Sequence, residues 1–133
     1  MTNTNVHTGS ISGGVRTVVR LENLAILLLT LLAYGYLHLG WILFAILLLA
    51  PDVSLLAYLA NPRLGAQCYN LVHSYIGPLA LLGVSHFYPH LLPFALIWVT
   101  HVAMDRALGY GLKYQTAFND THLGTIGRTV TSR

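Results

Sequence analysis

The sequence predicts an all-α, polytopic membrane protein with four antiparallel transmembrane helices and both termini in the cytoplasm. Of its 133 residues, 55% are hydrophobic and only 8% are charged, whereas a soluble domain carries roughly 25% charged residues. The apolar residues fall in four long blocks, and each block is long enough to cross about 30 Å of hydrocarbon. Because the connections between the blocks are short, the helices must run up and down in one bundle.

The four spans can be placed in order along the chain. The first apolar run covers residues 21–37 and the second covers 41–60, where Asn-Pro-Arg ends it. We expect the third helix over residues 64–84 and the fourth over 91–108, after an aromatic turn that contains a proline. Pro51 removes one backbone donor within the second span and should disturb that helix. Broken helices at membrane depth commonly line binding cavities.

The basic residues predict the orientation of the bundle. They lie near the N-terminus, in the second connection and near the C-terminal end, and the first and third connections hold no Lys or Arg. The positive-inside rule then places both termini in the cytoplasm. Attraction to anionic headgroups explains the net charge of +3, so we expect membrane lipid as a partner and no nucleic acid. The seven residues are Arg16, Arg20, Arg63, Arg106, Lys113, Arg128 and Arg133.

Three parts are expected along the chain. Residues 1–15 are rich in Thr, Asn, Ser and Gly and should form a disordered tail. Residues 16–112 should form the four-helix domain, and 113–133 a polar tail that could pack over the cytoplasmic mouth. An aromatic residue recurs at every fourth position from 110 to 118, which favours a short interfacial C-terminal helix.

Polar side chains of the second and third spans are predicted to meet. Asp52 lies eleven positions before Arg63, and His73 lies ten positions after it. At 1.5 Å per residue, both are about 15 Å from the interface on neighbouring antiparallel helices. They can therefore face each other, with Asn70 on the same face of the third helix as His73.

The first and fourth spans contribute further polar groups. His101 and Asp105 are four residues apart, which places them on one helical face. Glu22 and Asn23 open the first span, so every helix supplies a polar group to the cytoplasmic half of the bundle. Ionisable groups at this depth are costly and are typically functional.

This set of carboxylates and imidazoles matches the ligands of a divalent metal, with zinc, manganese or iron each possible. We expect Asp52, His73, His101 and Asp105 to bind the ion. Such an ion can lower the pKa of a bound water to about 7 and make a hydroxide nucleophile. Metal-assisted hydrolysis is the simplest chemistry, with Glu22 as candidate general base and Asp105 as a second catalytic group.

Simpler roles exist for the same residues. His101 and Asp105 could hydrogen-bond on one helix, Asp105 could pair with a nearby arginine, and Asp52 with His73 could form a structural bridge. Arg106 is expected to extend to the interface, and clamping an anionic headgroup is its alternative role.

In the tail, Asp120 and His122 suit a helix cap or a solvated turn. A tail folded over the mouth of the pocket could add His122 as a further ligand.

Several strings carry a family resemblance: RLENLAILLL, APDVSLLAYLANPRLG, YNLVHSYIGPL, THVAMDRALGYGLKY and FNDTHLG. They resemble a family of short bacterial integral membrane proteins catalogued as domain-of-unknown-function family 4260, over about residues 20–124. The resemblance implies the same four-helix architecture and a place in the bacterial inner (cytoplasmic) membrane, and it implies no activity.

A more distant similarity is to membrane-bound metal-dependent hydrolases. It rests on His73 in one helix and the H-x-x-x-D pattern of His101 and Asp105 in a later one. Those proteins carry additional histidines near the first motif, where this chain has Asn70.

The leading functional hypothesis is a metal-dependent membrane hydrolase that acts on a lipid or lipid-linked substrate from the cytoplasmic leaflet. The second is a small carrier or proton relay in which Asp52 and His73 exchange protons, with a homodimer supplying the pathway. The third is a non-catalytic membrane subunit, for which a haem held by His73 and His101 is one form.

Overall fold

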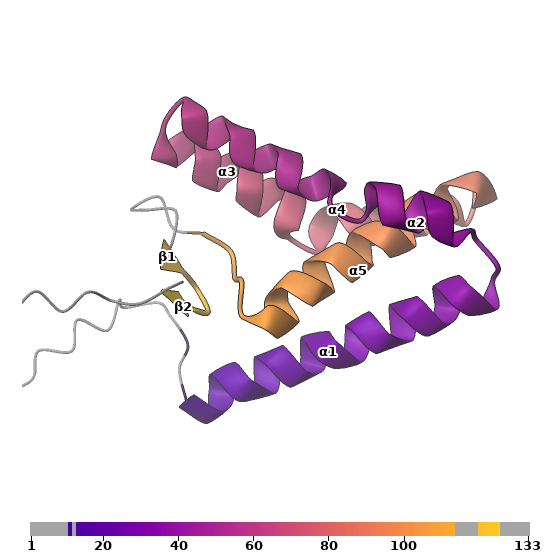
Figure 1. The fold of residues 1–133 in the computed structure, drawn as a ribbon, viewed down its shortest axis with the longest axis horizontal. Coiled ribbons are helices and arrows are strands. Elements are labelled where there is room, and N and C mark those ends of the chain that lie inside the picture. Colours follow the sequence, from indigo (N-terminus) through magenta and orange to yellow (C-terminus); the bar gives the residue numbers. More distant parts are fainter. Residues whose placement is uncertain (1–10, 12, 114–119, 126–133) are drawn as a thin grey trace, which may run out of the picture.

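The computed structural model describes residues 11, 13–113 and 120–125 of the chain. Within them the molecule is helical apart from one small hairpin, and the chain crosses it four times in alternating directions (Figure 1). Three crossings are long and apolar enough to span a membrane: Gly13–Tyr36, Trp41–Leu59 and Pro89–Leu108. The predicted all-α membrane fold is confirmed.

The first crossing is one unbroken helix, α1 (Gly13–Tyr36). It begins ahead of the predicted apolar run. At its far end the hydroxyl of Tyr34 donates hydrogen bonds to the carbonyls of Leu39 (3.3 Å) and Gly40 (2.8 Å). Gly40 has a φ of 93°, a left-handed conformation that glycine adopts without steric cost. These features turn the chain back into the second crossing.

The second crossing changes its helical form near Pro51, as the sequence predicted. It consists of α2 (Trp41–Leu47) and the 3-10 helix η1 (Ala50–Leu59). The 3-10 form usually lasts three or four residues, and longer stretches often mark functional or strained segments. Asp52 emerges from the first turn of η1.

The third crossing is broken, so the prediction of one continuous helix over residues 64–84 is wrong. It consists of α3 (Pro62–His73) and α4 (Ile76–Ser85). Ser74 ends α3 in an extended conformation with ψ 159°. The sequence carries signals of this break, because His73, Ser74 and Tyr75 are polar and Gly77-Pro78 follows them. The prediction from the length of the apolar block passed over these signals.

Side chains of the fourth crossing satisfy the carbonyls that this break exposes. The indole N–H of Trp98 donates to the carbonyl of Val72 (2.7 Å), and Arg106 donates to the carbonyl of His73 (3.4 Å). Unpaired backbone groups are expensive at membrane depth, so these two donors make the broken helix tolerable.

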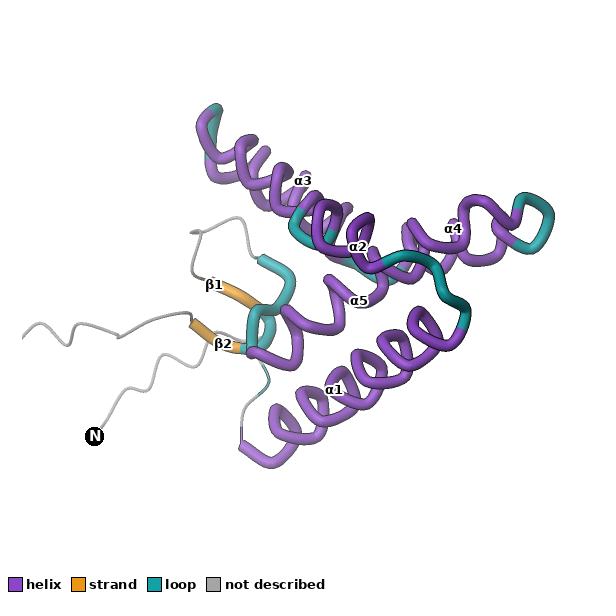
Figure 2. The backbone as a smooth tube through the Cα atoms, turned by 45° about the vertical axis from the view of Figure 1, so that its right-hand side comes forward, coloured by secondary structure: helices purple, strands orange, loops and turns teal. Residues whose placement is uncertain are grey.

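The fourth crossing occupies the centre of the molecule. It comprises the short η2 (Pro89–Leu91) and α5 (Leu92–Leu108). Helix α5 lies between α1 and the pair formed by η1 and α3 (Figure 2). Its middle, from Ala95 to Ala103, is almost entirely buried. Side chains on α5 can therefore reach all three other crossings.

The described part of the tail forms a small hairpin rather than a helix. Strands β1 (Asp120–Thr121) and β2 (Gly124–Thr125) pair antiparallel, and Lys113 forms a bridge with Thr121. The hairpin lies where α1 begins and α5 ends (Figure 1). The predicted interfacial helix falls largely on residues 114–119, and the predicted disordered tail largely on 1–10 and 12. Both of these ranges lie outside the described residues.

The outer surface of the helices is apolar. Large side chains such as Leu29, Ile42 and Leu59 are 66%, 81% and 86% exposed. An apolar surface of this extent is typical of contact with lipid.

The close packing of α4 on α5 gives a first prediction. A methyl group added at Gly77 would lie 2.5 Å from the Trp98 ring, whereas one added at Gly83 would meet nothing within 4 Å. Gly77→Ala should therefore destabilise the fold by about 1–3 kcal/mol, and Gly83→Ala should be neutral or slightly stabilising. Thermal unfolding in detergent compares these two variants of the same helix. Equal effects on the two would contradict the packing described here.

Candidate metal centre

Four predicted residues meet at one point inside the bundle. Asp52, His73, His101 and Asp105 each offer one ligand atom, and these four atoms lie within 4.8 Å of one another. The two histidines are buried, the Asp105 side chain is 14% exposed and that of Asp52 is 40% exposed. The structure thus brings together residues from the second, third and fourth crossings, as the depth argument required.

The spacing of the ligand atoms is that of a metal site. The Nε2 atoms of His73 and His101 are 3.0 Å apart, and each lies 3.3 Å from Oδ1 of Asp52. Oδ2 of Asp105 lies 3.6 Å from the first Nε2 and 3.4 Å from the second. Zinc–ligand bonds of about 2.0–2.1 Å in a tetrahedron separate the ligand atoms by about 3.3–3.4 Å. The cluster could therefore hold one ion at its centre with little movement.

Backbone carbonyls fix the orientation of both imidazole rings. His73 Nδ1 lies 3.0 Å from the carbonyl of Tyr69, and His101 Nδ1 lies 2.6 Å from that of Leu48. A carbonyl oxygen only accepts, so each Nδ1 must carry the proton. The two Nε2 lone pairs then point into the cluster, which is how a second partner prepares a histidine for metal binding.

This arrangement leaves an excess of acceptors. Two unprotonated Nε2 atoms face two carboxylate oxygens, and none of these four atoms carries a hydrogen in that state. Four acceptors so close together repel one another unless a cation or protons lie between them. A positive charge at the centre, from an ion or from protons, would relieve this repulsion.

Two interruptions in the helices create the site. Asp52 follows directly after the change from α2 to η1, and His73 is the last residue of α3. The C-terminal end of a helix carries a partial negative charge, which favours a cation. In a continuous helix at either place, the carbonyls of Leu48 and His73 would be paired within the helix and would not accept hydrogen bonds from α5.

Comparison with protein families gives one match. The model of a family described as a domain of unknown function, DUF4260, matches residues 16–126. The chain belongs to this DUF4260 family. No curated protein and no solved structure matches the chain. The predicted family is confirmed, and the more distant similarity to metal-dependent hydrolases gains no support from these comparisons.

In this DUF4260 protein, Tyr69 and Lys113 pack next to the four clustered residues. The Tyr69 ring stacks on His73 with 3.8 Å between centroids, and its hydroxyl donates to Asp105 (3.5 Å). The ammonium of Lys113 lies 4.7 Å from the Tyr69 ring centroid. Lys113 is only 4% exposed, and its positive charge interacts with the negative charge of Asp105.

Asn70 attaches the tail to the bundle. Its amide donates to the carbonyl of Lys113 (2.7 Å) and accepts from the N–H of Lys113 (2.6 Å). These two bonds hold Lys113, which follows the fourth crossing, against α3.

Asn23 and Arg106 stabilise the neighbourhood of the broken helix. The Tyr75 hydroxyl donates to the side chain of Asn23, and the Arg106 guanidinium lies 4.7 Å from the Tyr75 ring centroid. With the bond from Arg106 to the carbonyl of His73, these contacts link α1, α4 and α5 around the break.

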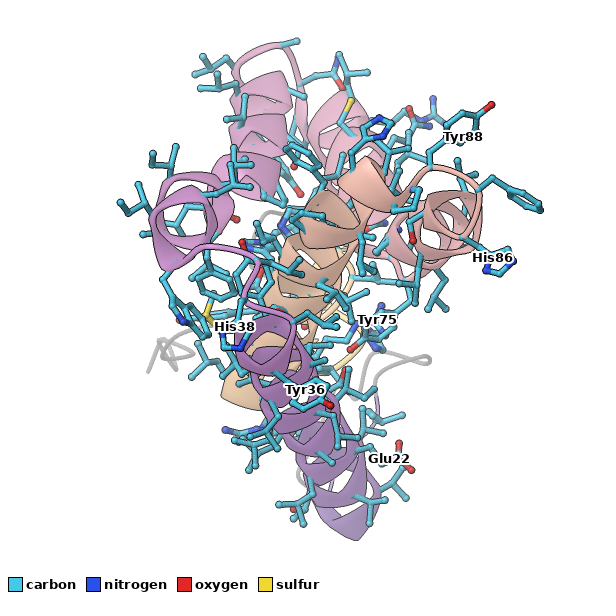
Figure 3. All side chains as sticks on the ribbon, turned by 90° about the vertical axis from the view of Figure 1, so that its right-hand side faces the viewer. Glu22, Tyr36, His38, Tyr75, His86 and Tyr88 are labelled. Carbon is cyan, nitrogen blue, oxygen red and sulfur yellow. The ribbon has the colours of Figure 1, made fainter. Side chains whose placement is uncertain are left out.

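Glu22, the predicted general base, is not brought to the cluster. Its side chain is exposed and projects from the outer side of α1 (Figure 3). The sequence placed it correctly near the start of the first span, but the neighbouring Asn23 is the residue that faces the interior. The position of Glu22 therefore gives no support to its predicted role as the general base of this cluster.

His122 lies in the hairpin turn and packs against residues 111 and 112. Its Nδ1 accepts the N–H of Leu112 (2.8 Å), and a methyl group added at Gly111 would lie 2.5 Å from this nitrogen. Burial lowers the pKa of His122, and the positive charge of Arg106 lowers it further. His122 is not one of the four clustered residues. The structure does not describe the side chain of Asp120.

From the sequence, Tyr69 and Lys113 were given no role in the site. Tyr69 lies four positions before His73 and on the same helical face, so the helical period could have identified it. Lys113 was counted only as a topology signal, although it is the only lysine in the chain.

Lys113 provides a pH prediction. Burial lowers its pKa from 10.5 to about 8, although the charge of Asp105 partly opposes this shift. Between these values the unfolded chain holds a proton that the folded protein has released, so stability should increase as the pH rises from about 8 to 10.5. Lys113→Met should remove this part of the pH dependence. Chemical unfolding of both proteins over this pH range measures it, and parallel curves would contradict the buried environment of Lys113.

Proposed function

We propose that this DUF4260 protein is a membrane metalloenzyme in which Asp52, His73, His101 and Asp105 bind one divalent ion. The proposed reaction is hydrolysis of a lipid or lipid-linked substrate. The observation that carries the proposal is a cluster of four acceptor atoms that lie within 4.8 Å of one another. Five of its six pairs are 3.0–3.6 Å apart, and backbone carbonyls orient both imidazoles.

The ligand types restrict the ion. Calcium and magnesium prefer oxygen ligands, whereas two imidazoles with two carboxylates suit zinc, manganese or iron. A haem is disfavoured because its porphyrin would have to fit between Nε2 atoms that are 3.0 Å apart. The carboxylates on both sides of this gap further favour one small ion.

The chemistry of hydrolysis needs a position for water beside the ion. A bound divalent ion would lower the pKa of that water to about 7. Asp52 is the most exposed of the four groups, with 40% of its side chain accessible, so water and substrate would approach on its side. That water would need a further position on the ion beside the four protein ligands, which manganese and iron sites with more than four ligands provide. Asp105 would bind the ion through Oδ2, the atom that faces the imidazoles, and its Oδ1 would orient the water or take its proton. The ammonium of Lys113 would attract the anionic part of a substrate.

The location of the site supports a lipid substrate. The centre lies among helices whose outer surface is apolar, and the tail with its lysine closes on it from the basic end of the bundle (Figure 1). We propose that this end faces the cytoplasm of a bacterial inner membrane, because the positive-inside rule orients the described basic residues in this way.

One observation favours a proton relay as a second candidate. The Nε2 atoms of His73 and His101 are within hydrogen-bond distance at 3.0 Å, and a shared proton could supply the positive charge that the cluster needs. Asp52 would then exchange protons with the outside. The relay predicts an active cluster without metal, so metal analysis separates the two candidates.

Metal content is the first test of the enzyme. The purified protein should contain about one equivalent of zinc, manganese or iron. Changes to outer partners of a metal ligand lower affinity about 10–100-fold, so His101→Ala and Asp105→Asn should lower it at least as much. His86→Ala is the matched control, because His86 is exposed at the opposite end of the bundle (Figure 3). Metal that is absent from the wild type, or that persists in both ligand variants, would contradict the proposal.

Activity is the second test. The metal-loaded protein in vesicles should release products from a phospholipid or a lipid-linked diphosphate, as measured by mass spectrometry. Chelation should abolish the release and the same metal should restore it. Asp52→Asn should lose activity, whereas Glu22→Gln should keep it because Glu22 lies outside the cluster. If the protein bound metal but was inactive on both substrate classes, the hydrolase assignment would be contradicted but metal binding would not.

A further inference from the structure

A second candidate site lies between α1 and α5 at the basic end of the bundle. It is a groove of about 330 Å³, within the size range of small-molecule sites. Its apolar walls come from both helices, and an arginine lies among its lining residues. None of the four residues of the metal centre lines this groove. The principal lining residues are Arg20, Leu21, Leu24, Leu27, Met104 and Leu108.

Two guanidinium groups lie together at the C-terminal end of α5, and one of them, that of Arg20, also lines the groove. Arg20 Nε donates to the carbonyl of Ala107 (2.9 Å). Arg16 Nη2 lies 3.2 Å from the position that a Cβ would occupy on Gly109, and Arg20 Nε lies 3.8 Å from it. The simplest role of both arginines is to satisfy the free carbonyls at the C-terminal end of α5.

That role leaves one donor unexplained. Arg16 Nε is buried and has no hydrogen-bond partner in the part of the chain that the structure describes. Neither arginine forms an ion pair with a carboxylate among the described residues. A buried charged donor without an acceptor is unfavourable, so an anion that reached the accessible part of this half-buried guanidinium would stabilise the site.

We propose that the groove binds one anionic phospholipid. The phosphate would lie on the guanidinium groups of Arg16 and Arg20, because the planar donor fork of arginine matches phosphate oxygens. One acyl chain would lie along Leu21, Leu24 and Met104. A free phosphate would satisfy the arginines but would leave this apolar wall empty. This site does not depend on the metal centre or on the proposed hydrolysis.

The test compares two lipids with identical acyl chains. Detergent-purified protein is titrated with phosphatidylglycerol or phosphatidylcholine, and affinity is measured by native mass spectrometry. The wild type should bind phosphatidylglycerol at least about tenfold more tightly. Arg16→Gln should remove most of this preference, a change of roughly tenfold for one charged hydrogen bond. Arg16→Lys should recover only part of it, because lysine keeps the charge without the fork.

Two controls make the result specific. Arg63→Gln removes an exposed charge at the same end of the bundle and should leave the lipid preference unchanged. Leu24→Trp should fill the groove and weaken both lipids while keeping both arginines. The unfolding temperature in phosphatidylcholine vesicles verifies that each variant is folded.

Three outcomes would overturn the proposal. Equal binding of the two lipids would exclude recognition of the anionic phosphate. Equal losses in Arg16→Gln and Arg63→Gln would indicate non-specific surface charge. Stabilisation by glycerophosphate as strong as that by the lipid would assign the arginines to a free anion. A loss of lipid preference with normal metal content would support this site regardless of whether the hydrolase assignment stands.

Discussion

Two buried imidazoles point their Nε2 atoms at each other across 3.0 Å, with a carboxylate oxygen on either side. Each ring is held in this orientation by a backbone carbonyl at its other nitrogen. Such a set of acceptors is unfavourable by itself in an apolar bundle, because its lone pairs and negative charges repel one another. The Tyr69 hydroxyl offsets part of this repulsion at Asp105. A cation at the centre would convert the rest into attraction and link three of the four crossings.

Helix α5 also supplies the hydrogen bonds that stabilise the backbone around this site. Both interrupted crossings expose carbonyls, and α5 provides a donor to each: His101 to Leu48, Trp98 to Val72 and Arg106 to His73. The interruptions place Asp52 and His73 next to the other ligands. The hydrogen bonds that stabilise the broken helices and two of the four groups that would hold the ion, His101 and Asp105, thus come from one element. A change on α5 should therefore affect the fold and the metal centre together.

Much of this arrangement could be predicted because depth in a bundle follows from counting residues. Asp52 and His73 were placed at one level from their distances to Arg63, and the spacing of His101 and Asp105 placed them on one face. The break at Ser74 could not be found in this way, because counting assumes a continuous helix; its signals in the sequence are the polar residues 73–75 and the Gly77-Pro78 pair that follows. Counting also could not decide between Glu22 and Asn23, since neighbouring positions on a helix point in different directions and only packing selects the inward one. Lys113 was missed because its position depends on a tail that Asn70 holds in place.

The central claim is that one ion is bound by nitrogen and oxygen ligands from separate crossings. X-ray absorption spectroscopy at the edge of the bound metal tests it most directly, because it reports the number, type and distance of the ligand atoms. The account predicts two imidazole nitrogens and at least two oxygens at about 2.0–2.2 Å. A spectrum without imidazole scattering, or one dominated by sulfur ligands, would contradict it.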